Sequence, residues 1–366
     1  MTGTIRNLGK AAAKSCLWVL RVLGQTLVII VICLILDYVL LATVFSGWKQ
    51  RWADAASAYT EAYIKTAYDH DLAPNANSTR VWGNIVYPWQ TDRYGLRIGA
   101  CAPGEAEKAL PAIFVIGDSF TEAIGAAYED SFAGLMACDA AKQGKAVWNL
   151  GVASYSPTIY FRKIRAVTQK LGIKPREIFV FLDLSDIDDD ANVYHVGPDD
   201  VVTSSVFHWF NIGQFLLGNF ATLRLAYDIY LSSTLATVGS LGQDRARWTL
   251  DPDLMRKWGR RGLEIAGRNL DQVVAICREW DCRMTLVVYP WPDNVEAGDR
   301  NSVQVTHWRE WAAARHVRFI DGFPAFFREP ADVALRKYFI AGDIHFSALG
   351  HRLLFDEVKR AIGGDY

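Results

Sequence analysis

The sequence predicts an α/β fold in which a parallel sheet is covered on both faces by helices. Short apolar segments without polar alternation recur along the chain, as in strands that are buried on both faces. Stretches with helical spacing separate these segments, and this alternation is typical of a three-layer α/β/α sandwich. With 366 residues, the chain is long enough to bury such a core.

The N-terminal segment, residues 1–47, is predicted to be a membrane anchor. Residues 1–23 carry four basic residues and no acid, and the apolar run from Thr26 to Phe45 is interrupted only by Asp37. About 20 apolar residues cross a bilayer as a helix. The positive flank favours a cytoplasmic N-terminus, a single pass through the cytoplasmic (inner) membrane and a periplasmic or extracellular remainder. A signal peptide is the alternative, but its apolar region is shorter and small residues mark its cleavage site.

A charged side chain such as that of Asp37 costs free energy when it lies in the middle of a membrane. Two interpretations remain open for it. Asp37 contacts a partner within the membrane, or it lies near the outer interface, where water reaches its carboxyl group.

Residues 48–90 are predicted to form a stalk and a lead-in to the main domain. Ala-rich spacing from Trp48 to Tyr68 favours a helix, and the segment Pro74-Asn-Ala-Asn-Ser78 breaks it. The stretch Tyr87–Arg97 is rich in turn residues, and a loop from Gly99 to Lys108 precedes the first strand of the sheet.

The domain over 91–366 contains the alternating elements. Strands are predicted at 112–116, 146–150, 177–184, 284–289 and 317–320, and helices near 129–142, 157–171, 252–280, 303–315 and 348–362. Residues 191–250 interrupt this rhythm with an apolar stretch, Phe207–Val238. Its internal polar residues make it a poor second membrane span, so we expect a helical lid or a segment packed over the sheet. Exposure of this stretch to the membrane surface stays open as an alternative.

Cysteine usage and charge limit the classes of function. The net charge of −1 offers no general attraction to nucleic acid. No C-x-x-C pair or histidine cluster is present, which argues against zinc. In an oxidising compartment, our preferred disulfide pairing is Cys101 with Cys138 and Cys277 with Cys282. The acidic run 186–190 is interpreted as a solvated loop rather than a calcium site.

The first predicted strand ends in a candidate nucleophile. The apolar run from Ile113 stops at Gly117-Asp118-Ser119, and a helix can begin after it. Ser119 would therefore lie at the carboxyl end of a strand and the amino end of a helix. Free backbone N–H groups and the helix dipole favour negative charge there. Capping of the helix is the alternative role of Ser119.

Three further segments are predicted to meet Ser119, because ligands bind beyond the carboxyl ends of parallel strands. They are Asn149–Ser156, Phe179–Asp186 and Gly342–Gly350. A serine needs a base in contact and donors for an oxyanion. His345 can be that base and Asp343 can orient it, while the N–H groups of Ser119 and Gly151 can hold the oxyanion. This chemistry requires neither a metal nor an organic cofactor.

These four segments resemble the SGNH, or GDSL, superfamily of serine esterases and acyltransferases over roughly Thr91–Ala361. The resemblance implies a flavodoxin-like sheet, Ser119 as nucleophile, Gly151 as oxyanion glycine, and Asp343 with His345 as acid and base. The lead-in Thr91–Arg97 looks like an element ahead of the nucleophile in many bacterial members. The segment Tyr289-Pro-Trp-Pro292 resembles a motif of membrane-anchored ones.

The chain departs from the family pattern at two places. The family has Gly-x-Asn-Asp in the third segment, where this chain has Asp183-Leu-Ser185-Asp186, so Ser185 is the candidate substitute for the oxyanion asparagine. One residue instead of two separates Asp343 from His345. This shorter spacing resembles the alginate O-acetylation proteins.

The resemblance and the anchor together imply a membrane-anchored enzyme that transfers acetyl groups to, or removes them from, an exported or cell-surface carbohydrate. A multispanning membrane acyltransferase is the partner that this architecture implies. Three aromatic side chains could line a carbohydrate groove or pack in the core; they are Tyr155, Tyr289 and Trp291. The alternative function is a catalytically silent subunit that binds polysaccharide or scaffolds a membrane complex, as the Ser185 departure suggests.

Overall fold

The computed structural model describes residues 2–44, 46, 62–82, 85–204, 216, 219–220, 222–223, 225–226 and 244–366. It divides into two compact units. One consists of Met1–Ala56 with Phe210–Tyr230, and the other consists of Ser57–Trp209 with Leu231–Tyr366.

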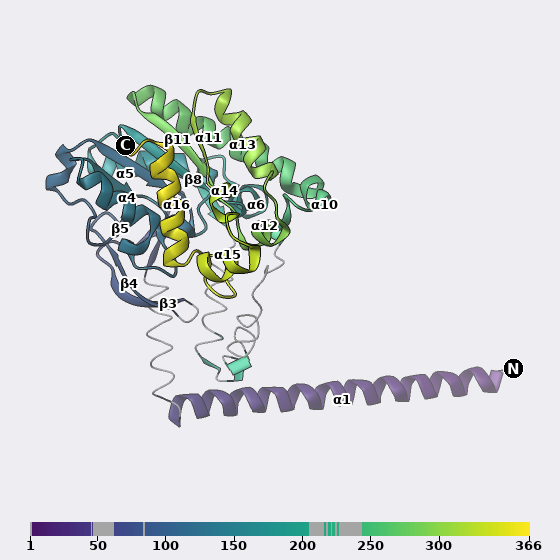
Figure 1. Cartoon of the computed structure of the whole chain (residues 1–366). Coiled ribbons are helices and arrows are strands. Elements are labelled where there is room, and N and C mark those ends of the chain that lie inside the picture. The colour runs from purple at the N-terminus through teal and green to yellow at the C-terminus, as the bar shows by residue number, and fades with distance from the viewer. Residues whose placement is uncertain are drawn as a thin grey trace. The chain divides into compact units, whose positions relative to one another are not determined.

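The larger unit is built on a five-stranded sheet in which every neighbouring pair of strands is parallel (Figure 1). Its strands are β6 (Ala112–Ile116), β7 (Ala146–Asn149), β8 (Glu177–Leu182), β11 (Arg283–Val288) and β12 (Arg318–Asp321). All five lie within one or two residues of the predicted positions. The spatial order β7-β6-β8-β11-β12 is the flavodoxin-like order 2-1-3-4-5, which confirms the predicted fold class.

Helices cover both faces of this sheet. On one face α4 (Phe132–Ala141) contacts α16 (Ala348–Ala361), and on the other α5 (Pro157–Leu171) contacts α11 (Arg260–Trp280). The indole of Trp311, on α13 (Val303–Ala313), lies against Gly267 of α11. The ends of α5 follow from its sequence, because Pro157 opens the first turn and Gly172 closes the last one at a φ of 70°.

Shorter elements fill the loops between the strands. Those up to Ser204 are η1 (Ala106–Ala109), α3 (Ser119–Glu122), η2 (Tyr128–Asp130), α6 (Ser185–Asp188), η3 (Asp189–Val193), β9 (Tyr194–Val196) and β10 (Val202–Ser204). Those from Asp244 onward are α9 (Asp244–Arg247), α10 (Pro252–Leu254), η4 (Met255–Gly259), α12 (Pro292–Ala297), α14 (Phe323–Phe326) and α15 (Ala331–Tyr338).

Antiparallel strands precede the parallel sheet, where the sequence predicts a helical stalk and a turn-rich lead-in. The hairpin β1 (Tyr63–Thr66) and β2 (Asp69–Leu72) is followed by the sheet of β3 (Asn77–Trp82), β4 (Ile85–Thr91) and β5 (Arg97–Ile98). The predicted helix is therefore wrong from Tyr63 onward, and 47–61 lie outside the described residues. Every residue of β2 is buried, so tertiary packing outweighs local helix propensity here.

The smaller unit contains one long helix, α1 (Thr2–Thr43). Within it, Leu20–Thr43 is long and apolar enough to cross a membrane, with a mean hydropathy of 2.7. The described residues between 216 and 226 belong to this unit and not to the unit of the sheet. The rest of Phe207–Val238 lies outside the described residues, and the predicted lid over the sheet stays a prediction.

Two disulfides confirm the predicted pairing of four cysteines. Cys101 bonds Cys138, which ties the loop before β6 to α4, and Cys277 bonds Cys282 across the turn between α11 and β11. Disulfides of this kind persist in oxidising compartments.

Candidate active site

Ser119 lies where β6 passes into α3, at the point where the strand order reverses. The chain moves from β6 to β7 on one side and later to β8 on the other, and ligands bind at such switch points. A Cβ atom on Gly117 would collide with the side chain of Thr121 and the carbonyl oxygen of Phe181, so the turn needs glycine. Asp118 caps α3 by accepting a hydrogen bond from the Phe120 N–H at 3.0 Å.

The structure brings Ser119, His345 and Asp343 together in one line of hydrogen bonds. Ser119 Oγ lies 2.8 Å from His345 Nε2, and His345 Nδ1 lies 2.5 Å from Asp343 Oδ1. The His345 backbone N–H also donates to Asp343 Oδ1 at 2.9 Å. His345 is buried and Ser119 half-buried, so the hydroxyl keeps access from outside.

Asp343 is held in its charged form by its neighbours. Burial alone would raise the pKa of Asp343, but the His345 imidazole and the hydrogen bonds from His345 and Trp82 lower that pKa below its usual value. Trp82, at the end of β3, donates from Nε1 to Asp343 Oδ2 at 3.0 Å, and its ring meets the His345 ring edge-on at 5.3 Å. Asp343 can therefore orient His345 and stabilise its imidazolium.

Replacing Trp82 by phenylalanine should lower kcat/KM about tenfold toward an activated acyl ester, because one hydrogen bond to the half-buried Asp343 carboxylate is lost while an aromatic ring remains beside His345. The measurement is ester hydrolysis by the full-length chain. Trp280→Phe is the matched control, since its indole donates to Glu279 on the surface. Equal losses in both variants would contradict a role for Trp82 at Asp343.

The N–H of Gly151 and the hydroxyl of Ser185 both donate hydrogen bonds to neighbouring side chains. The Gly151 N–H donates to Asn149 Oδ1 at 2.9 Å, and a Cβ on Gly151 would lie 2.5 Å from two atoms of the Thr121 side chain. Ser185 donates from both N and Oγ to Asp183 Oδ1, at 2.6 and 2.8 Å. As placed here, neither residue offers a donor to an oxyanion, which corrects the expectation for both.

Ser154 is a candidate for the donor that Gly151 does not provide. Its φ of 64° is in the left-handed region, three residues after Gly151. The N–H groups of Ser119 and Ser154 make no hydrogen bond to another residue in the described part of the chain. The Val152 N–H donates to the Gly117 carbonyl at 3.3 Å, so the loop carrying Ser154 runs beside the turn of Ser119.

Two buried side chains hold this loop from outside it. The Ala153 N–H donates to Glu122 Oε2 at 2.7 Å, and Glu122 also accepts from Trp89 Nε1 at 3.0 Å and Arg80 at 3.2 Å. His70 Nε2 lies 2.9 Å from the Ala153 carbonyl oxygen, while its Nδ1 lies 2.7 Å from the Asp69 carboxylate. These contacts connect the loop that carries Ser154 to α3 and β2.

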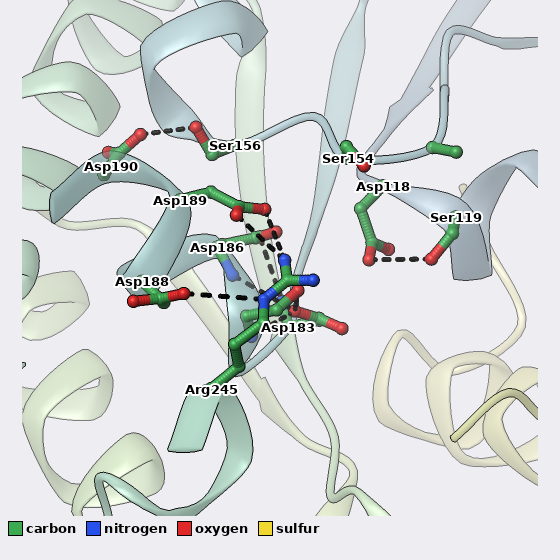
Figure 2. A network of polar contacts seen from close by, with 12 residues as sticks. Asp118, Ser119, Ser154, Ser156, Asp183, Asp186, Asp188, Asp189, Asp190 and Arg245 are labelled. Atoms are coloured by element: carbon green, nitrogen blue, oxygen red, sulfur yellow. Dashed lines mark hydrogen bonds and ion pairs between the residues drawn. The ribbon is translucent and has the colours of Figure 1, made fainter. Parts of the chain in front are cut away.

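A cluster of buried acids lies behind Ser119 (Figure 2). Oxygen atoms of Asp118, Asp183 and Asp186 lie within 4.8 Å of one another. Burial and the neighbouring Asp183 carboxylate raise the pKa values of Asp118 and Asp186 well above normal. Arg245 pairs with Asp189 at 2.8 Å beside this cluster. The prediction of a solvated acidic loop is wrong, because Asp186, Asp189 and Asp190 are buried and Asp188 is half-buried.

The raised pKa of Asp118 predicts a change of stability with pH. The unfolded carboxyl releases its proton near its usual pKa, while the folded one keeps it, so unfolding becomes easier as pH rises above that value. In Asp118→Asn, which imitates the protonated form, the free energy of unfolding should fall less between pH 5 and pH 8 than in the parent. Urea unfolding at both pH values measures this, and equal falls would contradict it.

The three aromatic candidates for a carbohydrate groove are core residues. Tyr155, Tyr289 and Trp291 are all 0% exposed, so none presents a surface to a sugar. Trp291 Nε1 donates to Asp183 Oδ2 at 2.7 Å, and the Tyr155 hydroxyl donates to the His70 carbonyl at 2.7 Å. Their role is to hold the acid cluster and the loop of Ser154 in place.

The lead-in motif has a structural role. Arg97 is 1% exposed, and its guanidinium donates to the carbonyl oxygens of Glu122 and Ala126 at 3.2 Å. It thereby fixes the chain that leaves α3. Sequence reasoning missed Trp82, Glu122, His70 and Ser154. His70 and Trp82 lie ahead of the first predicted strand, where no sequence pattern indicated a site.

Among known proteins, only solved structures resemble this chain. No family model and no curated protein matches the chain. The acetylxylan esterase Axe2 from Geobacillus stearothermophilus is 16% identical, over 70% of this chain and 95% of Axe2, with a TM-score of 0.40. TesA is 12% identical, over 69% of this chain and 98% of TesA, with a TM-score of 0.42. A putative acylhydrolase from Bacteroides fragilis is 11% identical, over 71% of this chain and 92% of that protein, with a TM-score of 0.40. None of these likenesses assigns an activity to this chain.

Proposed function

We propose that the chain is a membrane-anchored serine enzyme that transfers acyl groups through an acyl-serine intermediate. One observation carries the proposal: Ser119 Oγ, His345 and Asp343 are joined by hydrogen bonds of 2.8 and 2.5 Å at the switch point of the sheet. Ser119 lies more than 220 positions before Asp343 and His345 in the sequence. A hydroxyl, an imidazole and a carboxylate that are hydrogen-bonded in this order activate serine for attack.

The proposed reaction has two steps. His345 Nε2 takes the proton of Ser119 Oγ as that oxygen bonds the ester carbonyl carbon, and the resulting oxyanion faces the N–H groups of Ser119 and Ser154. His345 then returns the proton to the departing alcohol, whose bond to the acyl carbon breaks. In the second step water or an acceptor hydroxyl gives its proton to His345 as its oxygen bonds the acyl carbon. His345 then returns the proton to Ser119 Oγ, whose bond to the acyl carbon breaks.

The finer assignment rests on the motif resemblance and on the apolar helix. Acetyl as the acyl group and an exported or cell-surface carbohydrate as the substrate are what the resemblance implies. The short Asp343–His345 spacing and the anchor favour transfer to a sugar hydroxyl over hydrolysis, with a multispanning membrane protein as the source of acetyl groups.

Active-site labelling tests the proposed nucleophile. A fluorophosphonate should modify the full-length chain once, on the peptide that contains Ser119, as read by mass spectrometry. Ser119→Ala should abolish the modification, while Ser347→Ala, which removes a hydroxyl that caps α16, should retain it. A chain that stays unmodified would instead favour the silent polysaccharide-binding or scaffold subunit.

A second experiment separates transfer from hydrolysis. The full-length chain is incubated with p-nitrophenyl acetate and an oligosaccharide, and mass spectrometry detects an added acetyl group. Transfer predicts an acetylated sugar that is absent with Ser119→Ala. Free acetate accumulating with every acceptor tried would identify an esterase.

A further inference from the structure

Asp37 has its hydrogen-bond partners within the smaller unit. Its carboxylate accepts from the Thr222 hydroxyl at 2.6 Å and from the Thr222 backbone N–H at 3.1 Å. The Tyr38 and Phe220 rings lie 6.4 Å apart at the same place. Residues 185 positions apart are thus joined side by side, and Asp37 is only 8% exposed.

This contact lies inside the span and not at its end. The candidate span runs from Leu20 to Thr43, and Asp37 lies on the order of 9 Å from its C-terminal end along the helix axis. A carboxylate at that depth is costly unless a donor satisfies it. Thr222 supplies two donors, so the segment that carries it must reach the same depth.

The surface of that segment is also apolar. Leu216 and Leu223 are 39% exposed and Leu225 is 58% exposed. The anchor helix shows the same character, with Leu27 at 62% and Ile35 at 57%. Apolar side chains that face outward beside a membrane-spanning helix fit lipid, because apolar surface is more stable in contact with hydrocarbon than with water.

We propose that the segment around 216–226 is embedded in the bilayer beside the anchor helix, so that the chain enters the membrane at two separate places. The occupant of its exposed apolar surface is lipid acyl chains. The segment reaches that depth without being a second span, and the Asp37–Thr222 contact fixes it to the anchor.

Spin-label accessibility tests the proposal in the full-length chain. Leu225→Cys is labelled with a nitroxide in phospholipid vesicles, in a chain carrying Cys16→Ser and Cys33→Ser. Leu27→Cys, on the span, and Leu349→Cys, on the surface of α16, are the lipid and water references. The Leu225 label should collide with oxygen more than with a water-soluble nickel complex, as the Leu27 label does. A pattern like that of Leu349, or shielding from both reagents, would overturn the proposal.

Disulfide trapping tests the contact itself in the same background. Asp37→Cys with Thr222→Cys should cross-link within one chain on mild oxidation in vesicles. Thr26→Cys with Thr222→Cys is the matched control, because Thr26 lies three turns away and its hydroxyl bonds the Val22 carbonyl of its own helix. Equal cross-linking of the two pairs would contradict the contact. Neither readout depends on catalysis, so failure here is distinguishable from failure of the proposed enzyme.

Discussion

Replacing Ser119 by alanine is expected to lower kcat/KM toward p-nitrophenyl acetate by about 10⁴- to 10⁶-fold. The hydroxyl that would bond the acyl carbon is lost, while the backbone donors for the oxyanion remain. The measurement is the release of p-nitrophenol by the full-length chain, compared with the rate without enzyme.

Loss of folding does not account for such an effect. Ser119 is half-buried, and the cap of α3 comes from the Asp118 carboxylate, so the variant should unfold near the parent's midpoint. His345→Gln is expected to be nearly as inactive, and the double variant no worse than either single one, because the two groups act as a unit. Equal rates in the parent and Ser119→Ala would refute an acyl-serine mechanism.

Replacing Lys163 by methionine is expected to cost about 3–5 kcal/mol of unfolding free energy. Lys163 on α5 pairs with Asp71 on β2, and both side chains are 0% exposed. Burial would raise the pKa of Asp71, but the Lys163 charge and the Lys163 and Tyr68 hydrogen bonds hold that pKa below its usual value. Without Lys163, the buried carboxylate keeps the Tyr68 hydrogen bond and the charge of the partly exposed Lys170, but it loses its buried partner. Urea unfolding, followed by tryptophan fluorescence, measures the loss.

Two further variants separate charge from packing. Lys170 lies 3.6 Å from Asp71 and is 41% exposed, so Lys170→Met should cost less than about 1 kcal/mol. Adding Asp71→Asn to Lys163→Met should recover part of the loss, because no charge then remains buried. A Lys163→Met variant as stable as Lys170→Met would show that the pair contributes little.

The parallel sheet was predictable because its strands are apolar on both faces. Ile113–Ile116 and Phe179–Leu182 each read as a buried strand, and Pro157 and Gly172 mark the ends of a helix. The antiparallel strands before β6 carry no such signal. Strand β2 reads Asp-His-Asp-Leu, and its burial depends on partners distant in sequence, such as Lys163.

The juxtaposition of Ser119, His345 and Asp343 could be predicted from the sequence, but the partners of the Gly151 and Ser154 N–H groups could not. Gly151 was favoured because glycine permits unusual turns, yet its backbone is needed for close packing against Thr121. The left-handed position fell on Ser154, a residue type that gives no such signal. Only the partners of each N–H group, which depend on tertiary contacts, distinguish the two.

The antiparallel strands ahead of β6 have a practical consequence for where the larger unit can be cut. Trp82 reaches Asp343, and Tyr63, Arg80 and Trp89 converge on Glu122. A fragment that begins at Thr91, where the motif resemblance starts, would lack all four of these side chains. The shortest fragment that retains the candidate site therefore begins before Tyr63, and proteolysis within β1 to β4 would remove groups that position Asp343 and Glu122.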